Sequence, residues 1–360
     1  MRRTEVFVHD MAHPEDCTGL ARDLAQGRLR AGDIRAVFIK TEGNGLDNDW
    51  SRPLALRALA QHLPLNATPN GTPPPMVVVS GGCEGMLTPH MTILACSGEA
   101  DGTQETAPAL AIGSFLSKPL RAAELGREAH ALCTRDAVER ACVDAGLAPD
   151  EVVCVQVLSP WMGRSLLASA PARVDLVARG AHESKPAIRA AAALGAGMAL
   201  REIRPEDIDW TPGGAIARRR TNRVAVTAGD TDGRIHALVL GHGRGWSGTL
   251  RAASAQMTDM LDLQAVAAVR QGTLVAAFFK GDPPADGRVR GQRTTMGADS
   301  DIHAFRHFRA AMSGVFGAAL GSPRVFIGGG AEYQSASGGG LLTTIFDTNS
   351  PAKPGTGNPL

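Results

Sequence analysis

One arrangement of segments recurs three times along this chain, and this repetition constrains the fold more than any other feature. Each copy opens with a β-rich run: IRAVFIKTEGNG, EVVCVQVLSPWMG and TLVAAFFKGDPPADGR. An Ala-rich amphipathic stretch follows, with an arginine near its start at Arg52, Arg189 or Arg306. A second β-rich run then breaks into small residues. The order strand, helix, strand therefore predicts an α/β fold built from three similar units.

Clusters of turn-forming residues separate the copies. We expect a first unit over residues 1–105, a second over 110–248, a third over 250–346 and a flexible tail over 347–360. The closing runs MVVVSGGCEG, RVAVTAGDTDG and RVFIGGGAEYQ end near Ser80, Thr227 and Gly328. A strand that runs into small residues exposes backbone N–H groups, which are suited to receive a carbonyl oxygen.

The bulk composition excludes several classes of partner. Lys plus Arg total 37 against 36 for Asp plus Glu, so no charge excess attracts nucleic acid or an anionic membrane. Aromatic residues make up only 4% of the chain, which leaves few platforms for stacking bases. No apolar run reaches 18 residues, and the start MRRTEVFVHDM lacks the pattern of a signal peptide. These features predict a cytoplasmic protein that binds a small molecule.

Cysteines and histidines do not form a recognisable metal motif. The six cysteines lack CxxC spacing, and the histidines at positions such as His303 and His307 lack HExxH spacing. Cys83 lies three residues after Ser80 and is an alternative nucleophile, although a free cysteine after a strand is more often buried and inert.

Several segments resemble the signature segments of cyanuric acid hydrolases and barbiturases. They are MAHPEDCTGLA, KTEGNGLDNDWSR, SGGCEGMLTPH, DGRVRGQR and GGGAEYQ. The similarity extends over almost the whole chain and is densest in the first and third units. It implies a pseudo-threefold, barrel-like arrangement of three βα units with a central active site, and a homo-oligomer, in this family a tetramer.

In the family that the chain resembles, each unit contributes a lysine, an arginine and a serine that face a small cyclic amide. The first unit has the complete set, Lys40, Arg52 and Ser80. The second keeps Arg189 but has Leu158 for the lysine and Thr227 for the serine. This second pair is the principal base and nucleophile of the family, and leucine cannot accept a proton.

The third unit keeps Lys280 and Arg306 but has Gly328 where the family has serine. The expected substrate-binding set also includes the residues that follow the three strand ends: Gly81, Ala228 and Gly329. The implied activity is ring-opening hydrolysis of a cyclic amide, imide or ureide. Ser80 is the expected nucleophile, Lys40 the base and Lys280 a further electrostatic or proton-handling group, while the three arginines hold the ring oxygens.

Two other classes of function stay open because Leu158 replaces the catalytic lysine. One is a cyclase, isomerase or lyase that acts on a related heterocycle, and the other is a catalytically inactive binding protein. Lys185 is an alternative base, although a solvated loop lysine is the simpler interpretation.

No organic cofactor is implied, but the resemblance suggests a structural Mg or Ca ion held largely by oxygen atoms in the third unit. The expected ligands are Asp282, Ala331, Gln334, Ser335, Ala336 and Gly339.

Overall fold

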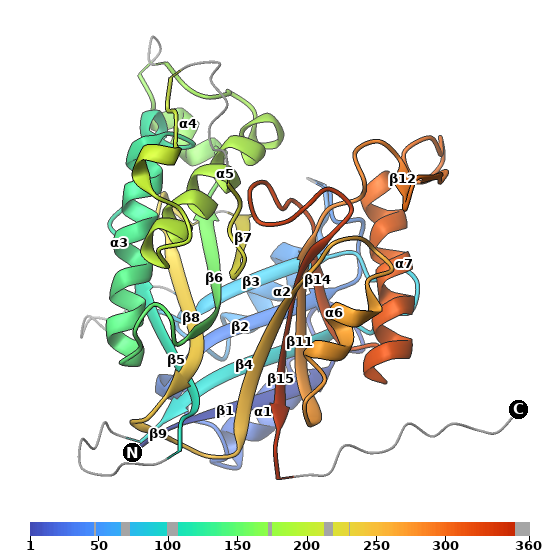
Figure 1. The fold of residues 1–360 in the computed structure, drawn as a ribbon. Helices are drawn as coiled ribbons and strands as arrows, with labels where there is room; N and C mark the ends of the chain where they lie inside the picture. Colours follow the sequence, from blue (N-terminus) through green and yellow to red (C-terminus); the bar gives the residue numbers. More distant parts are fainter. Residues whose placement is uncertain are drawn as a thin grey trace, which may run out of the picture.

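A computed structural model describes residues 1–46, 48–65, 73–98, 107–171, 175–211, 219–229 and 231–349. The described chain folds into three mixed β-sheets with helices packed around them (Figure 1). The last residues of the predicted tail, 350–360, and the predicted end of the first unit, at residues 99–105, lie outside the described residues.

The first sheet has the strand order β3-β2-β4-β1-β9. The strands are β1 (Arg2–Asp10), β2 (Ile34–Thr41), β3 (Met76–Gly81), β4 (His90–Ser97) and β9 (Trp246–Ser247). Strand β2 is parallel to β3 and antiparallel to β4, which in turn pairs antiparallel with β1. The helical segments of this part are α1 (Thr18–Ala25), η1 (Ala31–Asp33) and α2 (Ser51–Leu59).

The second sheet has the order β5-β8-β6-β7. The strands are β5 (Ala109–Leu116), β6 (Val152–Pro160), β7 (Val224–Gly229) and β8 (His236–Gly243). The helical segments are η2 (Ala122–Glu124), α3 (Glu128–Ala145), α4 (Arg164–Ser169), α5 (Ala181–Ala199) and η3 (Pro205–Asp207). The predicted Ala-rich stretch around Arg189 covers only the C-terminal part of α5, which begins earlier, at Ala181, and contains Pro186.

The third sheet has the order β10-β15-β11-β14. The strands are β10 (Leu250–Met257), β11 (Thr273–Gly281), β14 (Val325–Gly328) and β15 (Gly340–Asp347). The helices are α6 (Leu263–Ala268) and α7 (Ala304–Leu320), and a short hairpin joins β12 (Arg288–Val289) to β13 (Gln292–Arg293).

All three sheets place their strands in a corresponding order, with the long second strand between the third and fourth. The predicted strand, helix, strand segments coincide with β2-α2-β3, β6-α5-β7 and β11-α7-β14. The expected barrel-like closure is wrong. Within the described ranges the strand ladders form separate open sheets, because no backbone hydrogen bonds continue the ladders from β3, β7 or β14 to the next sheet.

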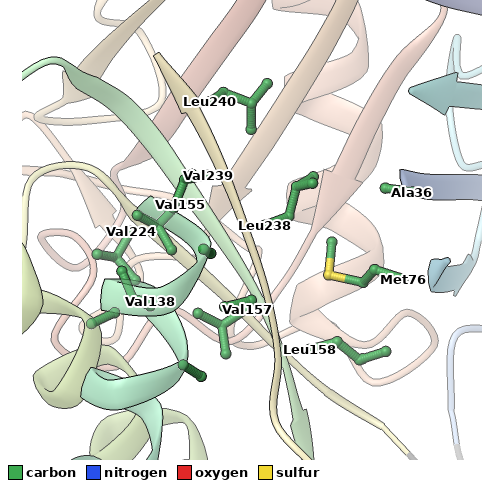
Figure 2. Packing of buried hydrophobic residues seen from close by; sticks show 14 of the residues in the cluster. Ala36, Met76, Val138, Val155, Val157, Leu158, Val224, Leu238, Val239 and Leu240 are labelled. Carbon is green, nitrogen blue, oxygen red and sulfur yellow. The ribbon is translucent and has the colours of Figure 1, made fainter. Parts of the chain in front are cut away.

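A shared hydrophobic core joins the three sheets. Phe38 of the first sheet packs edge-on against Phe278 and Phe326 of the third, with ring centroids 4.9 and 5.4 Å apart. The same cluster continues into the second sheet through Val157 and Leu158. Figure 2 shows residues of β6 and β8 in this cluster together with Met76 and Ala36 of the first sheet. Each buried phenylalanine contributes about 1.5–3 kcal/mol, so the inward faces of the sheets are held together.

Helices cover the outer faces of the sheets. In Figure 1, α3 and α5 lie along the second sheet, while α6 and α7 lie along the third on the opposite side of the molecule. Among the described residues, the helices are all too short or too polar to cross a membrane.

Candidate active site

Each sheet places side by side, near the end of its long strand, the two positions that match the lysine and the serine of the family that the chain resembles. The long strand (β2, β6 or β11) is parallel to a shorter neighbour (β3, β7 or β14), so paired positions lie at the same level. We call each such pair a station and number the stations along the chain. The stations are Lys40 with Ser80, Leu158 with Thr227, and Lys280 with Gly328.

One cavity of about 650 Å³ connects the three stations. Ser80, Thr227 and Gly328 all contribute to its wall. We call it the central cavity. The buried Lys40 lies directly behind the wall, and Leu158 borders an adjoining cavity. The central cavity also gathers the other residues predicted to bind the substrate: Arg52, Gly81, Arg189, Ala228, Lys280, Arg306 and Gly329.

The first station brings a buried amine to a hydroxyl group. Lys40 Nζ lies 3.2 Å from Ser80 Oγ, and it also donates to the carbonyl oxygens of Gly81 at 3.3 Å and Ile327 at 2.9 Å. Burial, together with the positive charge of the nearby Arg309 guanidinium, lowers the pKa of Lys40 to about 7. A lysine with this pKa is largely neutral above pH 7, so its lone pair can accept the proton of the Ser80 hydroxyl.

The third station has a second buried amine but no side-chain nucleophile. Lys280 Nζ donates to the carbonyl oxygen of Gly329 at 2.5 Å. Burial lowers the pKa of Lys280 to about 7, and the positive charges of Arg189 and Lys40 act in the same direction. Gly328 has no hydroxyl to activate, so this station can exchange a proton or stabilise charge but cannot form an acyl-enzyme.

The second station has no ionisable side chain. Leu158 is buried within the shared core, with only 9% of its surface exposed. Its partner Thr227 keeps a hydroxyl group, but leucine has no lone pair that could accept the proton of that hydroxyl. Of the three stations, only the first combines a side-chain base with a hydroxyl nucleophile.

An arginine that the sequence reasoning missed lies next to the first station. Arg309 is 7% exposed and forms a doubly hydrogen-bonded ion pair with Glu84 at 2.7 and 2.6 Å. It follows Arg306 by three residues in α7, so both arginines emerge from the same side of the helix and line the central cavity. That spacing is the signal in the sequence that could have identified Arg309.

A carboxylate fixes the loop between β2 and α2. Asp49 accepts hydrogen bonds from the backbone of Gly45 at 2.7 Å and from the backbone and hydroxyl of Ser51 at 3.0 and 2.5 Å. Its carboxylate is so close to Gly81 that a Cβ atom there would lie 1.7 Å from Asp49 Oδ2. Glycine is therefore required directly after Ser80, and the hydrogen bonds from Asp49 to Ser51 hold the start of α2, where Arg52 lies.

The three predicted arginines reach the cavity while bonded to protein groups. Arg189 forms a doubly hydrogen-bonded pair with Glu332, at 2.6 Å for both bonds. Arg306 Nε lies 3.4 Å from a carboxylate oxygen of Glu84, and Arg52 donates to the carbonyl oxygen of Leu46. An Arg–carboxylate pair fixes the orientation of the planar guanidinium, whose remaining N–H groups can hold a ring oxygen.

Cys83, the alternative nucleophile, and Lys185, the alternative base, both lie close to the site. Cys83 lies in a neighbouring cavity that also contains Glu84, and burial raises the pKa of its thiol to about 11, which disfavours the nucleophilic thiolate. Lys185 lines the central cavity, and its Nζ lies 4.6 Å from the ring centroid of Trp161. This cation–π contact holds its ammonium group beside the second station.

The oxygen atoms predicted to hold a cation are already used within the protein. Both carboxylate oxygens of Asp282 accept backbone hydrogen bonds, from Gly330 at 2.5 Å and from Ala331 at 2.6 Å. Burial also raises the pKa of Asp282, which opposes an ionised ligand. Backbone oxygens of four other predicted ligands, Ala331, Gln334, Ala336 and Gly339, accept hydrogen bonds, and Ser335 donates its hydroxyl. A carbonyl oxygen that accepts one hydrogen bond keeps a second lone pair, so the cation site stays a prediction, and the proposed chemistry does not depend on it.

Comparison with known proteins gives a consistent result. A family model described as an amidohydrolase ring-opening protein matches residues 5–347. A cyanuric acid amidohydrolase of Methylobacterium sp. (strain 4-46) is 36% identical, over 98% of this chain and 99% of its own length. A cyclic amide hydrolase of Azorhizobium caulinodans is 34% identical, over 95% and 99%. The crystal structure of a cyanuric acid hydrolase from A. caulinodans matches with a TM-score of 0.85 and 31% identity, over 97% of this chain and 100% of that one.

Proposed function

Because the chain belongs to the family of ring-opening amidohydrolases, we propose that it opens a small cyclic amide by hydrolysis, with Ser80 as nucleophile and Lys40 as base. The observation that carries this proposal is the 3.2 Å contact between Lys40 Nζ and Ser80 Oγ. The first station supplies both groups that acyl transfer needs, and it lies where the central cavity can receive a ring carbonyl.

The proposed reaction has two halves. Ser80 Oγ attacks a ring carbonyl carbon while its proton moves to the neutral Lys40 Nζ. The ring C–N bond then breaks, and the lysine returns the proton to the departing nitrogen, which leaves a ring-opened acyl-enzyme. Lys40 next deprotonates a water molecule that attacks the ester. The serine leaves with a proton, and the product carries a new carboxylate at the opened end.

The surrounding cations suit the charge that develops on the substrate. Arg52, Arg189 and Arg306 lie around the same cavity and can hold the ring oxygens that do not react. The backbone N–H group of Gly81 follows the nucleophile directly and is the proposed donor to the developing oxyanion. Lys280 contributes an amine that can stabilise or exchange charge on the far side of the ring.

Turnover of a compound panel tests this proposal. Cyanuric acid, barbiturates, uracils, hydantoins and succinimides are incubated with the protein, and the ring-opened acid is detected by mass spectrometry. Replacing Ser80 by Ala should lower kcat by at least about 1,000-fold, since loss of a serine nucleophile can cost on the order of 10⁶-fold. Thr227→Ala at the second station is the matched control and should have an effect of less than about tenfold.

Unchanged turnover in the Ser80→Ala variant would reject the assignment of the nucleophile. Thermal stabilisation of the wild-type protein by a ring that it does not open would instead indicate a binding protein. Formation of an isomer without uptake of water would indicate a non-hydrolytic enzyme.

A further inference from the structure

A second cavity of about 340 Å³ lies beside the central cavity. This cavity lies next to the second station, because Leu158 and Thr227 both form part of its wall. The two cavities adjoin, because five residues line both of them: Asn48, Arg52, Val79, Thr227 and Ala228. A substituent on a ring in the central cavity would therefore have to pass only these shared residues to enter the second cavity.

Large apolar side chains form much of the second cavity. Trp50, Pro53 and Leu56 follow one another at intervals of three residues where α2 begins, so they share one side of the helix. Trp50 is 77% exposed and Leu56 38% exposed. Leu158 and Trp161 close the opposite wall. Apolar surface that stays open to water beside a polar site is typical of a place where a ligand completes the packing.

Leu158, at the position where the resemblance leads us to expect a lysine, makes the second-station side of the site apolar. Leu158 has the same place in its ladder as Lys40 in the first sheet, so a lysine there would bring an amine to this wall. The leucine side chain borders the second cavity instead, and the extra methyl group of Thr227 adds to the apolar surface. Asp49 also lines this cavity, but its carboxylate already binds Gly45 and Ser51 and is not free to recognise a charged group.

We propose that the second cavity is a subsite for an apolar ring substituent, so the substrate class is a cyclic imide or ureide that carries an alkyl or aryl group. This inference rests on the proposed function, because the ring itself is placed in the central cavity. An unsubstituted ring would leave the apolar wall at Leu158 and Trp161 in contact with water, and a cationic substituent would lose its hydration beside Arg52 without gaining a partner.

Binding measured apart from turnover tests the subsite. Isothermal titration calorimetry on the Ser80→Ala variant compares hydantoin with 5-benzylhydantoin, and succinimide with benzylsuccinimide. The substituted ring should bind at least about tenfold more tightly in at least one pair, since even one methylene group in an apolar pocket is worth about 10- to 200-fold. The substituted ring should also have the higher kcat/KM in the wild-type protein.

Two wall variants locate the effect, each in the Ser80→Ala background. Leu158→Lys places a polar amine in the apolar subsite and should reduce the preference for the substituted ring to less than about threefold. Because a buried lysine can prevent folding, Leu56→Glu provides a milder change at a half-exposed position. Leu132→Glu is its matched control, because Leu132 is also helical, is 39% exposed and lies outside both cavities. Only the Leu56 variant should lose preference.

The possible results separate this inference from the proposed function. Preferential binding of the substituted ring without turnover would overturn the hydrolase proposal and leave the subsite supported. Turnover or binding with no preference, or a preference that Leu158→Lys and Leu56→Glu leave unchanged, would overturn the subsite. If no ring of either kind binds, both proposals fail.

Discussion

The first and second stations have the same backbone setting and opposite chemistry. Strands β2 and β6 each pair antiparallel with a further strand, β4 or β8. In these pairs Lys40 is opposite His90 and Leu158 is opposite His236. Both histidines are buried, and burial lowers the pKa of each to about 4, so both are neutral near pH 7. Even this neighbouring residue is the same, yet one station holds an amine next to a hydroxyl and the other holds leucine.

This difference shows that the geometry of a station does not depend on its catalytic side chains. The strand ladders are held by backbone hydrogen bonds, which any residue except proline can supply. A buried lysine costs folding free energy because its charged form loses hydration, whereas a leucine at the same level adds to the core. The second station therefore keeps the strand pairing of the fold without an amine, and its leucine forms part of an apolar wall.

Replacement of the Lys40 amine should produce the largest difference in activity between the first and second stations. Lys40→Met removes the base of the first station and should lower kcat by about 100- to 10,000-fold. Leu158→Met is the matched change at the second station and removes no proton acceptor, so its effect should be far smaller. Steady-state kinetics on the best substrate of the panel measure both variants. Equal losses would mean that the two stations do not differ in function.

The acidic limb of the pH profile should report the amine. Burial lowers the pKa of Lys40 to about 7, and the neutral amine is the active form in the proposed mechanism. The value of kcat/KM should therefore rise about tenfold per pH unit below pH 7 and level off above it. The pKa of Lys280 is also about 7, and Lys280→Met serves to distinguish the two lysines. This variant should keep the acidic limb. If kcat/KM of the Lys280→Met variant does not depend on pH, the base is Lys280 of the third station and not Lys40.

Rebuilding the second station is the most subtle test. In the Ser80→Ala background, the double change Leu158→Lys with Thr227→Ser restores an amine next to a hydroxyl at the corresponding level of β6 and β7. Because the backbone setting is the same, we expect turnover of an unsubstituted ring to recover by about tenfold over Ser80→Ala alone. No recovery in a folded variant, as judged by circular dichroism, would show that matching backbone register does not make the stations equivalent.

Local sequence patterns predicted the elements that carry the site. The apolar runs that end near Lys40 and Lys280 are strands, and the Ala-rich stretches after Arg52 and Arg306 are helices, since local periodicity fixes which face of each element is buried. Helix α5 begins at Ala181, before the predicted Ala-rich stretch, and packs against α3, a long-range contact that local periodicity does not reveal. Closure into a barrel was the error, since pairing at sheet edges depends on long-range geometry.

Sequence alone determined the chemical inventory: three arginines at matching places, two lysines of the expected three, and one hydroxyl paired with a lysine. Only the tertiary structure decided how these groups act on one another. Lys40 Nζ donates to the carbonyl oxygen of Ile327, 287 positions away in the chain. The lowered pKa of Lys40, the pairing of Arg309 with Glu84 and the apolar cavity beside Leu158 arise in the same way. Burial and electrostatic interactions depend on distances in space, and no local pattern encodes those distances.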